Sequence, residues 1–314
     1  MVKIITYLYE VNDIYYLLYV VVTDLSAVSD EVFRLLKKAR HVRLSTKLLQ
    51  DQEVDVVTQY QVYLRLILIW LGLALLPSVL LLTDQQVFPW LDLSHWPATS
   101  LYSLTSTGTS PYAIVTVLVF WALSFKFMNK VHWQKMVLAT LFGLTVSFTL
   151  NHGLKSHFEE PRPNFTWLSQ QADSPIDLAT FYQQKSKERR ADVKAALHQY
   201  QDESNPQQLH TVPPMNVSKS LQHHWAHEVG YAFPSGHTIF AITLVLTASY
   251  FLLLSGATSL NIIVFLWGLG MGTSRMLLGM HWPQDVLAST CLAAIISALS
   301  IVIIEKVWVR FKAK

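Results

Sequence analysis

Three short stretches of the sequence place ionisable residues at the ends of long apolar runs. They are residues 155–163, 234–237 and 274–285. If these runs cross a membrane, a helical fold can bring their ends together at one membrane surface. Three cations, two histidines and one carboxylate then converge, which suits an oxyanion substrate and a histidine nucleophile. The combination favours phosphoryl chemistry on a lipid.

The third stretch carries the residues best suited to covalent chemistry. Pro283 is expected at the first position of a helix, which places Asp285 in the first turn, where the helix dipole stabilises a carboxylate. His281, just outside that helix, is expected to donate one ring N–H to Asp285 and to keep its other nitrogen bare. The pattern therefore predicts His281 as the nucleophile and His237 as the acid that protonates the leaving oxygen.

The remaining motif residues suit a phosphate group. Ser235 is expected to cap the helix that follows it, and Gly236 to let the backbone approach a ligand, because helix N-termini bind phosphate. Lys155, Arg162 and Arg275 supply the positive charge that a phosphoryl transition state needs. The sequence shows no carboxylate cage for magnesium. We therefore expect a metal-independent enzyme with no cofactor.

Each of these features has an ordinary structural explanation when it is taken singly. A lone Lys or Arg at a span end usually snorkels to the interface, and proline or Ser-Gly at a helix start is common capping. A charged residue within a span costs about 2.5–3.5 kcal/mol on insertion scales. The placement of all six groups on one face therefore favours a functional interpretation.

A cluster of histidines further along the chain is a weaker candidate. His223, His224 and His227 stand before Glu228, but their order does not match a zinc-hydrolase motif and no third ligand is marked. No metal site is predicted here. Glu228 is expected to be solvated rather than to line a pocket.

The composition is typical of an integral membrane protein. Hydrophobic residues make up 52% of the chain and charged residues 14%, whereas soluble domains carry about 25% charged residues. The net charge of +3 is too small to indicate nucleic acid as a partner. The single cysteine, Cys291, lies in an apolar run. We predict an all-α membrane protein with a helical-bundle core and six transmembrane helices, at about 62–82, 112–128, 136–150, 237–254, 262–278 and 286–304.

Two appendages accompany the spans. Residues 1–60 are predicted to be a cytoplasmic N-terminal extension with no assigned fold, and residues 61–314 to form the six-span domain. Within that domain, residues 164–231 join spans three and four. Their middle, about 181–201, is helix-forming and charged, so a solvated helical insertion over the site is expected.

The basic residues give the orientation. Segment 126–135 has three lysines and no acid, the tail after residue 304 has four basic residues, and segment 83–110 has none. By the positive-inside rule, both termini are cytoplasmic. All three motifs and the insertion then fall on the outer face.

The spacing of the motifs resembles that of the type 2 phosphatidic acid phosphatase superfamily. The pattern is Lys, six residues, Arg-Pro; then Pro-Ser-Gly-His; then Ser-Arg, five residues, His, three residues, Asp. The longer stretches 230–238 and 274–285 resemble the bacterial phosphatidylglycerophosphatase B group, which is similar too in its six spans and charged outer insertion. The resemblance covers about residue 62 to the C-terminus.

The resemblance implies the same residue roles as the chemistry does. A phosphohistidine intermediate would form on His281, with His237 as proton donor and Asp285 orienting the nucleophile. The phosphate would be held by Lys155, Arg162, Ser235, Gly236, His237 and Arg275.

The resemblance also implies a substrate class and a location. The superfamily dephosphorylates phosphatidylglycerophosphate, phosphatidate, lysophosphatidate and undecaprenyl diphosphate. The protein would lie in the bacterial inner membrane as a multi-pass protein, with its site facing the periplasm and a lipid phosphate as its substrate.

Two rival functions remain. Vanadium haloperoxidases share this type of pocket, but they are soluble, and six spans speak against one. A transporter would more often place its charges near the bilayer midplane and would not need the His281–Asp285 pair. Release of phosphate from a lipid in the absence of metal would distinguish a lipid phosphatase from a haloperoxidase and from a transporter.

Overall fold

The computed structural model describes residues 46–171, 174–201 and 216–312, and these form helices and no strand. The expected all-α membrane fold is confirmed. The chain divides into two compact units, 1–57 and 58–314, and every predicted site residue lies in the second. The helices are α2 (Thr46–Leu82), α3 (Trp96–Ser106), α4 (Tyr112–Ser124), α5 (Lys130–Phe158), α6 (Pro163–Ser169), α7 (Leu178–Phe181), α8 (Ser186–Gln201), α9 (Lys219–His227), α10 (Gly236–Leu254), α11 (Thr258–Leu277) and α12 (Pro283–Lys312).

The expected N-terminal extension lies largely outside the described residues, which begin at Thr46. From that residue α2 continues unbroken to Leu82. The helix therefore runs across the boundary expected at residue 60.

Five of the described helices are long and apolar enough to cross a membrane. The sixth expected span, 112–128, corresponds to α4, which has 13 residues and ends at Ser124. At 1.5 Å per residue, such a helix covers about 20 Å of a hydrocarbon core of about 30 Å. The count of six spans therefore stays a prediction. The five longer candidates are Gln59–Leu82, Lys130–Lys155, Gly236–Leu254, Thr258–Leu277 and Pro283–Arg310.

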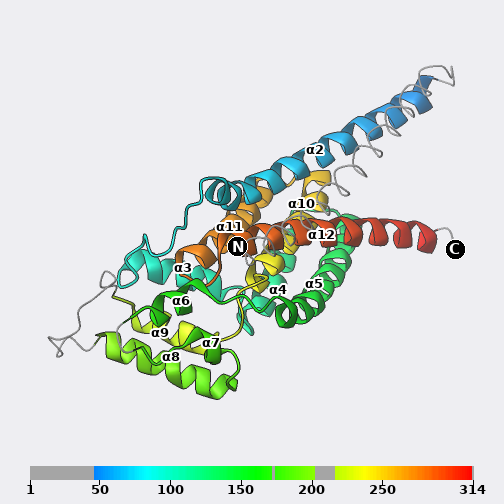
Figure 1. The fold of residues 1–314 in the computed structure, drawn as a ribbon. Coiled ribbons are helices and arrows are strands. Elements are labelled where there is room, and N and C mark those ends of the chain that lie inside the picture. The colour runs from blue at the N-terminus through cyan, green and yellow to red at the C-terminus, as the bar shows by residue number, and fades with distance from the viewer. Residues whose placement is uncertain (1–45, 172–173, 202–215, 313–314) are drawn as a thin grey trace. The chain divides into compact units, whose positions relative to one another are not determined.

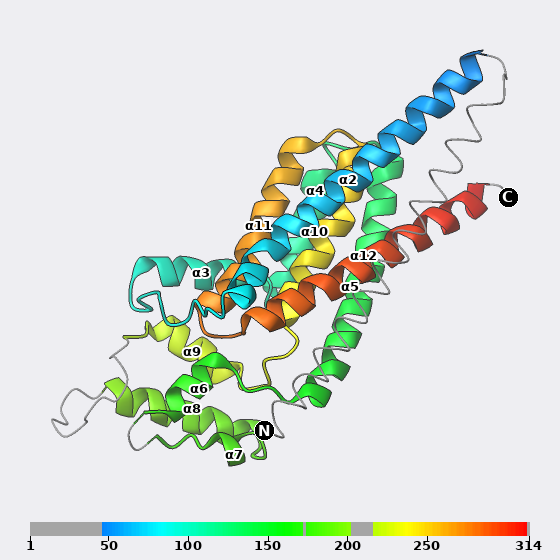
Figure 2. The same cartoon turned by 45° about the horizontal axis from the view of Figure 1, so that its top comes forward.

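Helix α10 is the central element of the bundle and packs against α5, α11 and α12 (Figures 1 and 2). From Thr238 to Leu252 every side chain except Phe240 is buried. The helix ends where Gly256 adopts φ +70°, a left-handed conformation that favours glycine. This burial on all sides explains why the span reads as a continuous apolar run.

The two ends of the bundle have different chemistry. At one end the start of α5 meets the end of α10, where His132 Nδ1 lies 3.0 Å from Ser255 Oγ. Lys135 on α5 also pairs there with Glu305 on α12. At the other end, the end of α5 meets the starts of α10 and α12 and the end of α11. That second end holds all three motifs.

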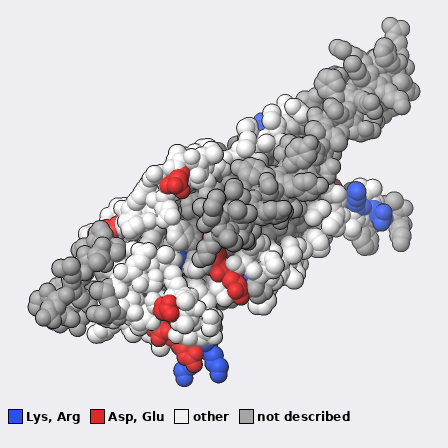
Figure 3. Space-filling model, in the orientation of Figure 1, with Lys and Arg blue, Asp and Glu red and all other residues white. Residues whose placement is uncertain are grey.

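The insertion between α5 and α10 shares an apolar core with residues outside it, among them Phe88, Leu93 and Leu278. Helices α6 to α9 lie together at the motif end of the bundle, beside α3 (Figure 2). Trp225 of α9 is fully buried and its Nε1 donates to the Leu278 carbonyl at 3.0 Å. Helix α8 buries Val193 and Leu197, while Lys187, Arg190 and Lys194 are exposed. Figure 3 shows Lys and Arg side chains standing out at this end of the molecule. The described part of the insertion is therefore packed on the motif end of the bundle and exposes charged side chains on α8.

Candidate active site

The three motifs meet at one end of the bundle, each at the end of a helix. Lys155 lies in the last turn of α5 and Arg162 is the N-cap of α6. The Pro-Ser-Gly-His motif starts α10, and Arg275 lies in the last turn of α11. His281 sits in the short loop before α12, whose first turn contains Asp285. The structure thus brings together every residue that the sequence nominated.

The loop between α11 and α12 is held by a hydrogen-bonded helix ending. Gly279 has φ +69° and donates its N–H to the Met276 carbonyl at 3.1 Å, while the Met280 N–H donates to the Arg275 carbonyl at 3.0 Å. This pair of bonds is a Schellman motif. The His281 N–H also donates to the Arg275 carbonyl, at 3.1 Å. One backbone carbonyl therefore sets the position of His281 relative to the Arg275 side chain.

His281 and Asp285 form the expected buried pair. The ring Nδ1 lies 3.2 Å from Asp285 Oδ2, and that oxygen also accepts from the Trp282 N–H at 3.0 Å. Asp285 is fully buried and His281 is 2% exposed. Burial, followed by the charges of Arg162, Arg275 and Lys155, lowers the pKa of His281 well below its usual value. The imidazole is therefore neutral near pH 7, with its Nε2 lone pair available for attack.

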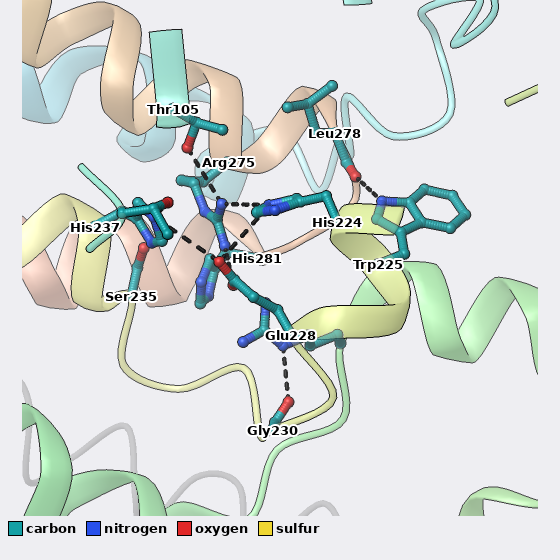
Figure 4. A network of polar contacts seen from close by, with 12 residues as sticks. Thr105, His224, Trp225, Glu228, Gly230, Ser235, His237, Arg275, Leu278 and His281 are labelled. Carbon is teal, nitrogen blue, oxygen red and sulfur yellow. Dashed lines mark hydrogen bonds and ion pairs between the residues drawn. The ribbon is translucent and has the colours of Figure 1, made fainter. Parts of the chain in front are cut away.

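Two buried arginines converge on one carboxylate. Arg162 Nη1 donates to Glu228 Oε2 at 3.1 Å, and Arg275 Nη2 donates to the same oxygen at 2.7 Å (Figure 4). Arg162 Nε also donates to the Gly230 carbonyl at 2.8 Å, and Arg275 Nη1 donates to Thr105 Oγ1 at 3.2 Å. These bonds hold both guanidinium groups in the fork geometry that binds planar or tetrahedral oxyanions.

Glu228 corrects the expectation that it would be solvated. Its side chain is only 16% exposed. Burial alone would raise the pKa of this carboxyl, but the charges of Arg275, His237 and Arg162 outweigh that effect and hold it well below the usual value. The segment that follows α9 places this residue between the two arginines, although they stand 66 and 47 positions away in sequence.

His224 belongs to the same network. Its Nε2 lies 3.0 Å from Arg275 Nη1 and 3.7 Å from Glu228 Oε1. Burial, and then the charges of Arg275 and Arg162, lower the pKa of His224 to about 4 despite the opposing effect of Glu228. The neutral ring therefore accepts from the guanidinium. His223 and His227 lie exposed on the other side of α9 and stack on each other.

His237 lies on the opposite side of Glu228 from His224. Its Nε2 is 2.9 Å from Thr109 Oγ1 and 3.8 Å from Glu228 Oε1. Gly108 allows this approach, because a Cβ there would stand 3.1 Å from the imidazole Cδ2. The loop after α3 therefore positions His237.

One expectation about the start of α10 requires correction, and the role of Gly236 toward a ligand stays a prediction. Ser235 is the N-cap residue, but its side chain caps no backbone N–H and accepts from Thr238 Oγ1 at 2.9 Å instead. Its own N–H donates to Ser289 Oγ of α12 at 2.8 Å. At Gly236 an added Cβ would stand 2.8 Å from Asn151 Nδ2. The Asn151 side chain of α5 would therefore have to move if Gly236 carried a larger side chain.

Lys155 lies at the edge of the site. Its Nζ donates to the Tyr231 carbonyl at 3.3 Å, and its side chain is partly exposed. It lies on the α5 side of the site and is more exposed than the two arginines.

Sequence reasoning missed Thr105 and Thr109, and it considered His224 and Glu228 without assigning them to the site. Each lies outside the three motifs, and its residue type is common in the kind of segment where it stands. One signal was present for the threonines. They stand in the polar stretch 105–110, which joins two apolar runs at the same membrane face as the motifs.

Comparison with known proteins places the chain in a family. Residues 135–308, more than half of the chain, match the PAP2 superfamily. Phosphatidylglycerophosphatase B of Haemophilus influenzae is 34% identical over 212 residues, covering 66% of this chain and 81% of that protein. Phosphatidylglycerophosphatase B of Escherichia coli K12 is 31% identical over 207 residues, covering 63% and 72%. These matches confirm the resemblance that the three motifs indicate. The chain belongs to the PAP2 superfamily.

Proposed function

We propose that this protein is an integral membrane lipid phosphatase that hydrolyses the phosphomonoester of phosphatidylglycerophosphate, the diphosphate of undecaprenyl diphosphate, or both. Phosphatidate and lysophosphatidate belong to the same substrate class. The observation that carries the proposal is the buried His281–Asp285 pair, 3.2 Å apart, which stands among the charges of Arg162, Arg275 and Lys155. The name of the two relatives favours phosphatidylglycerophosphate.

The reaction proceeds in two steps through a phosphohistidine. In the first, His281 Nε2 attacks phosphorus, a P–N bond forms, and the bond from phosphorus to the lipid oxygen breaks. His237 donates its proton to the departing lipid oxygen. In the second, His237 takes a proton from water, the resulting hydroxide attacks phosphorus, and the P–N bond breaks to release inorganic phosphate.

The charge that develops on the phosphoryl oxygens meets fixed cations. Arg162 and Arg275 are buried and already oriented by neighbouring acceptors, so they need little reorganisation during the reaction. Lys155 adds a third positive charge at the rim. Because these groups supply the positive charge that magnesium supplies in many phosphoryl-transfer enzymes, we propose a metal-independent reaction.

The substrate class and the metal question can be tested together. Purified protein in detergent should release inorganic phosphate from at least one member of a panel of lipid phosphates and diphosphates, and excess EDTA should not lower the rate. Relative kcat/KM values across the panel identify the preferred lipid. Complete loss in EDTA with rescue by zinc or magnesium would contradict the metal-independent mechanism.

The location of the site follows from the chemistry of the two bundle ends. Segment 126–135, Lys306 and Arg310 lie at the end opposite to the motifs. With the basic end in the cytoplasm, the site faces the periplasm, at the outer leaflet of the bacterial inner membrane. The insertion 164–231 is then periplasmic.

Thiol accessibility tests this topology. In a Cys291→Ala background, a cysteine at exposed Lys187 of α8 should react with a membrane-impermeant maleimide in intact spheroplasts, and a cysteine at exposed Lys126 should not. Both should react after the membrane is permeabilised. Labelling of Lys126→Cys alone in intact spheroplasts would invert the topology and place the reaction in the cytoplasm.

The pH dependence follows from the nucleophile. Since the pKa of His281 lies well below its usual value, the group is protonated, and inactive, only at pH values below that lowered pKa. The acid limb of the kcat/KM profile should therefore lie well below pH 6.5, once the profile is corrected for the second ionisation of the substrate phosphate. The rate should also fall where the group that protonates the leaving oxygen loses its proton, giving a bell-shaped profile. An acid limb at pH 6.5 that does not change with the pKa of the substrate phosphate would contradict a lowered pKa of His281.

A further inference from the structure

The Glu228 carboxylate occupies the position where the proposed function requires an anion. Its Oε2 accepts from both buried arginines, at 3.1 and 2.7 Å, and its Oε1 lies 3.8 Å from His237 and 3.7 Å from His224. Figure 4 shows this carboxylate among Arg275, His224, His237 and His281. These are the donors that a bound phosphoryl group would use, so the carboxylate and a substrate phosphate compete for the same guanidinium groups.

The geometry indicates that the Glu228 carboxylate can be displaced and is not needed to hold the two arginines in place. Only one of the two carboxylate oxygens has donors at hydrogen-bonding distance, because 3.7 and 3.8 Å are too long for hydrogen bonds. Both arginines keep other acceptors when Glu228 leaves: Gly230 for Arg162, and Thr105 and His224 for Arg275. Glu228 itself follows the last residue of α9, in a non-helical segment where its side chain can turn away.

We propose that Glu228 is an internal anionic ligand that the substrate phosphate must displace, and that this competition selects phosphomonoesters and diphosphates over phosphodiesters. The inference rests on the proposed function. A carboxylate carries one negative charge, as does the phosphodiester of an ordinary membrane phospholipid. A phosphomonoester carries close to two near neutral pH. In a bilayer crowded with phosphodiesters, a cationic pocket without an internal anion would be filled by the wrong lipid.

The first test is direct binding, which needs no turnover. Orthophosphate is titrated into detergent-solubilised wild-type protein, Glu228→Gln and Glu188→Gln by isothermal titration calorimetry at pH 8. Glu188 is an exposed α8 residue, so its substitution removes one charge from the insertion outside the site. Glu228→Gln should bind phosphate at least about tenfold more tightly, since a like charge no longer competes for the arginines. Equal or weaker binding would overturn the proposal, because a group that only braces the arginines lowers affinity when it is lost.

The second test concerns selectivity. With a lipid phosphomonoester as substrate in mixed micelles, added phosphatidylglycerol should raise the apparent KM of Glu228→Gln by roughly tenfold more than that of wild-type protein or Glu188→Gln. The kcat at saturating substrate should not respond to the phosphodiester in any of the three proteins. Equal inhibition of wild-type protein and Glu228→Gln would overturn the selectivity.

Two further measurements keep the inference separate from folding and from the proposed function. If Glu228→Gln does not fold, the infrared difference spectrum of wild-type protein on phosphate addition should still show an altered carboxylate stretch, because Glu228 changes partners. An unchanged stretch, with phosphate bound, would overturn displacement. If wild-type protein binds phosphate but hydrolyses no lipid phosphate, the proposed function fails while the calorimetric comparison still decides the inference.

Discussion

His281→Ala should lower kcat by about 10⁴-fold or more, because removing a nucleophile leaves only the contribution of binding and electrostatics. The same variant should form no phosphoenzyme, whereas wild-type protein given labelled substrate and quenched without acid should yield a phosphohistidine. The measurement is phosphate release combined with detection of acid-labile, alkali-stable label on the protein.

The controls separate the nucleophile from the acid. His198→Ala, at an exposed histidine of α8, should retain wild-type activity and labelling. His237→Ala should still accept label slowly from an ester with a good leaving group, because only proton donation to the leaving oxygen is lost. Undiminished turnover in His281→Ala would rule out the mechanism.

Asp285→Asn should lower kcat by about 10³- to 10⁴-fold with little change in structure. Asp285 Oδ2 lies 3.2 Å from His281 Nδ1. A carboxylate there accepts a hydrogen bond from Nδ1–H and so favours the tautomer with a free Nε2 lone pair. An asparagine amide can donate to Nδ1 instead, and the imidazole proton then moves to Nε2, where it blocks attack. At 1.36 kcal/mol per tenfold change, this loss corresponds to about 4–5.5 kcal/mol of transition-state stabilisation.

The matched control is Asp84→Asn. Asp84 is exposed, has φ +51° and lies in the turn after α2. Asparagine tolerates this left-handed conformation, so the variant should fold and turn over normally. Phosphoenzyme formation in Asp285→Asn at the wild-type rate would show that Asp285 does not set the tautomer.

The sequence by itself was enough to nominate the motif residues and most of the helices that carry them. Long apolar runs must form helices in a membrane, since every backbone polar group there needs an internal partner. Because successive spans cross the membrane in opposite directions, the end of α5 lies at the same membrane surface as the start of α10. The local rules at Pro283 and Asp285 were also sufficient, because a proline at the first helical position and a carboxylate in the first turn depend on neighbouring residues alone.

Tertiary structure alone decided what fills the space between the motifs. Glu228 and His224 lie in the site because Trp225 of α9 packs into an apolar core shared with Phe88 and Leu278 and donates to the Leu278 carbonyl. That packing joins residues 53 positions apart, and no local pattern of charge or periodicity reports it. Ser235 and Gly236 show the same limit. Ser235 was predicted to cap the helix, whereas its hydroxyl accepts from Thr238 Oγ1, and Gly236 also lies beside the Asn151 side chain of α5. Spacing along one chain reports neighbours on one helix, while the shape of a pocket depends on which helices pack together.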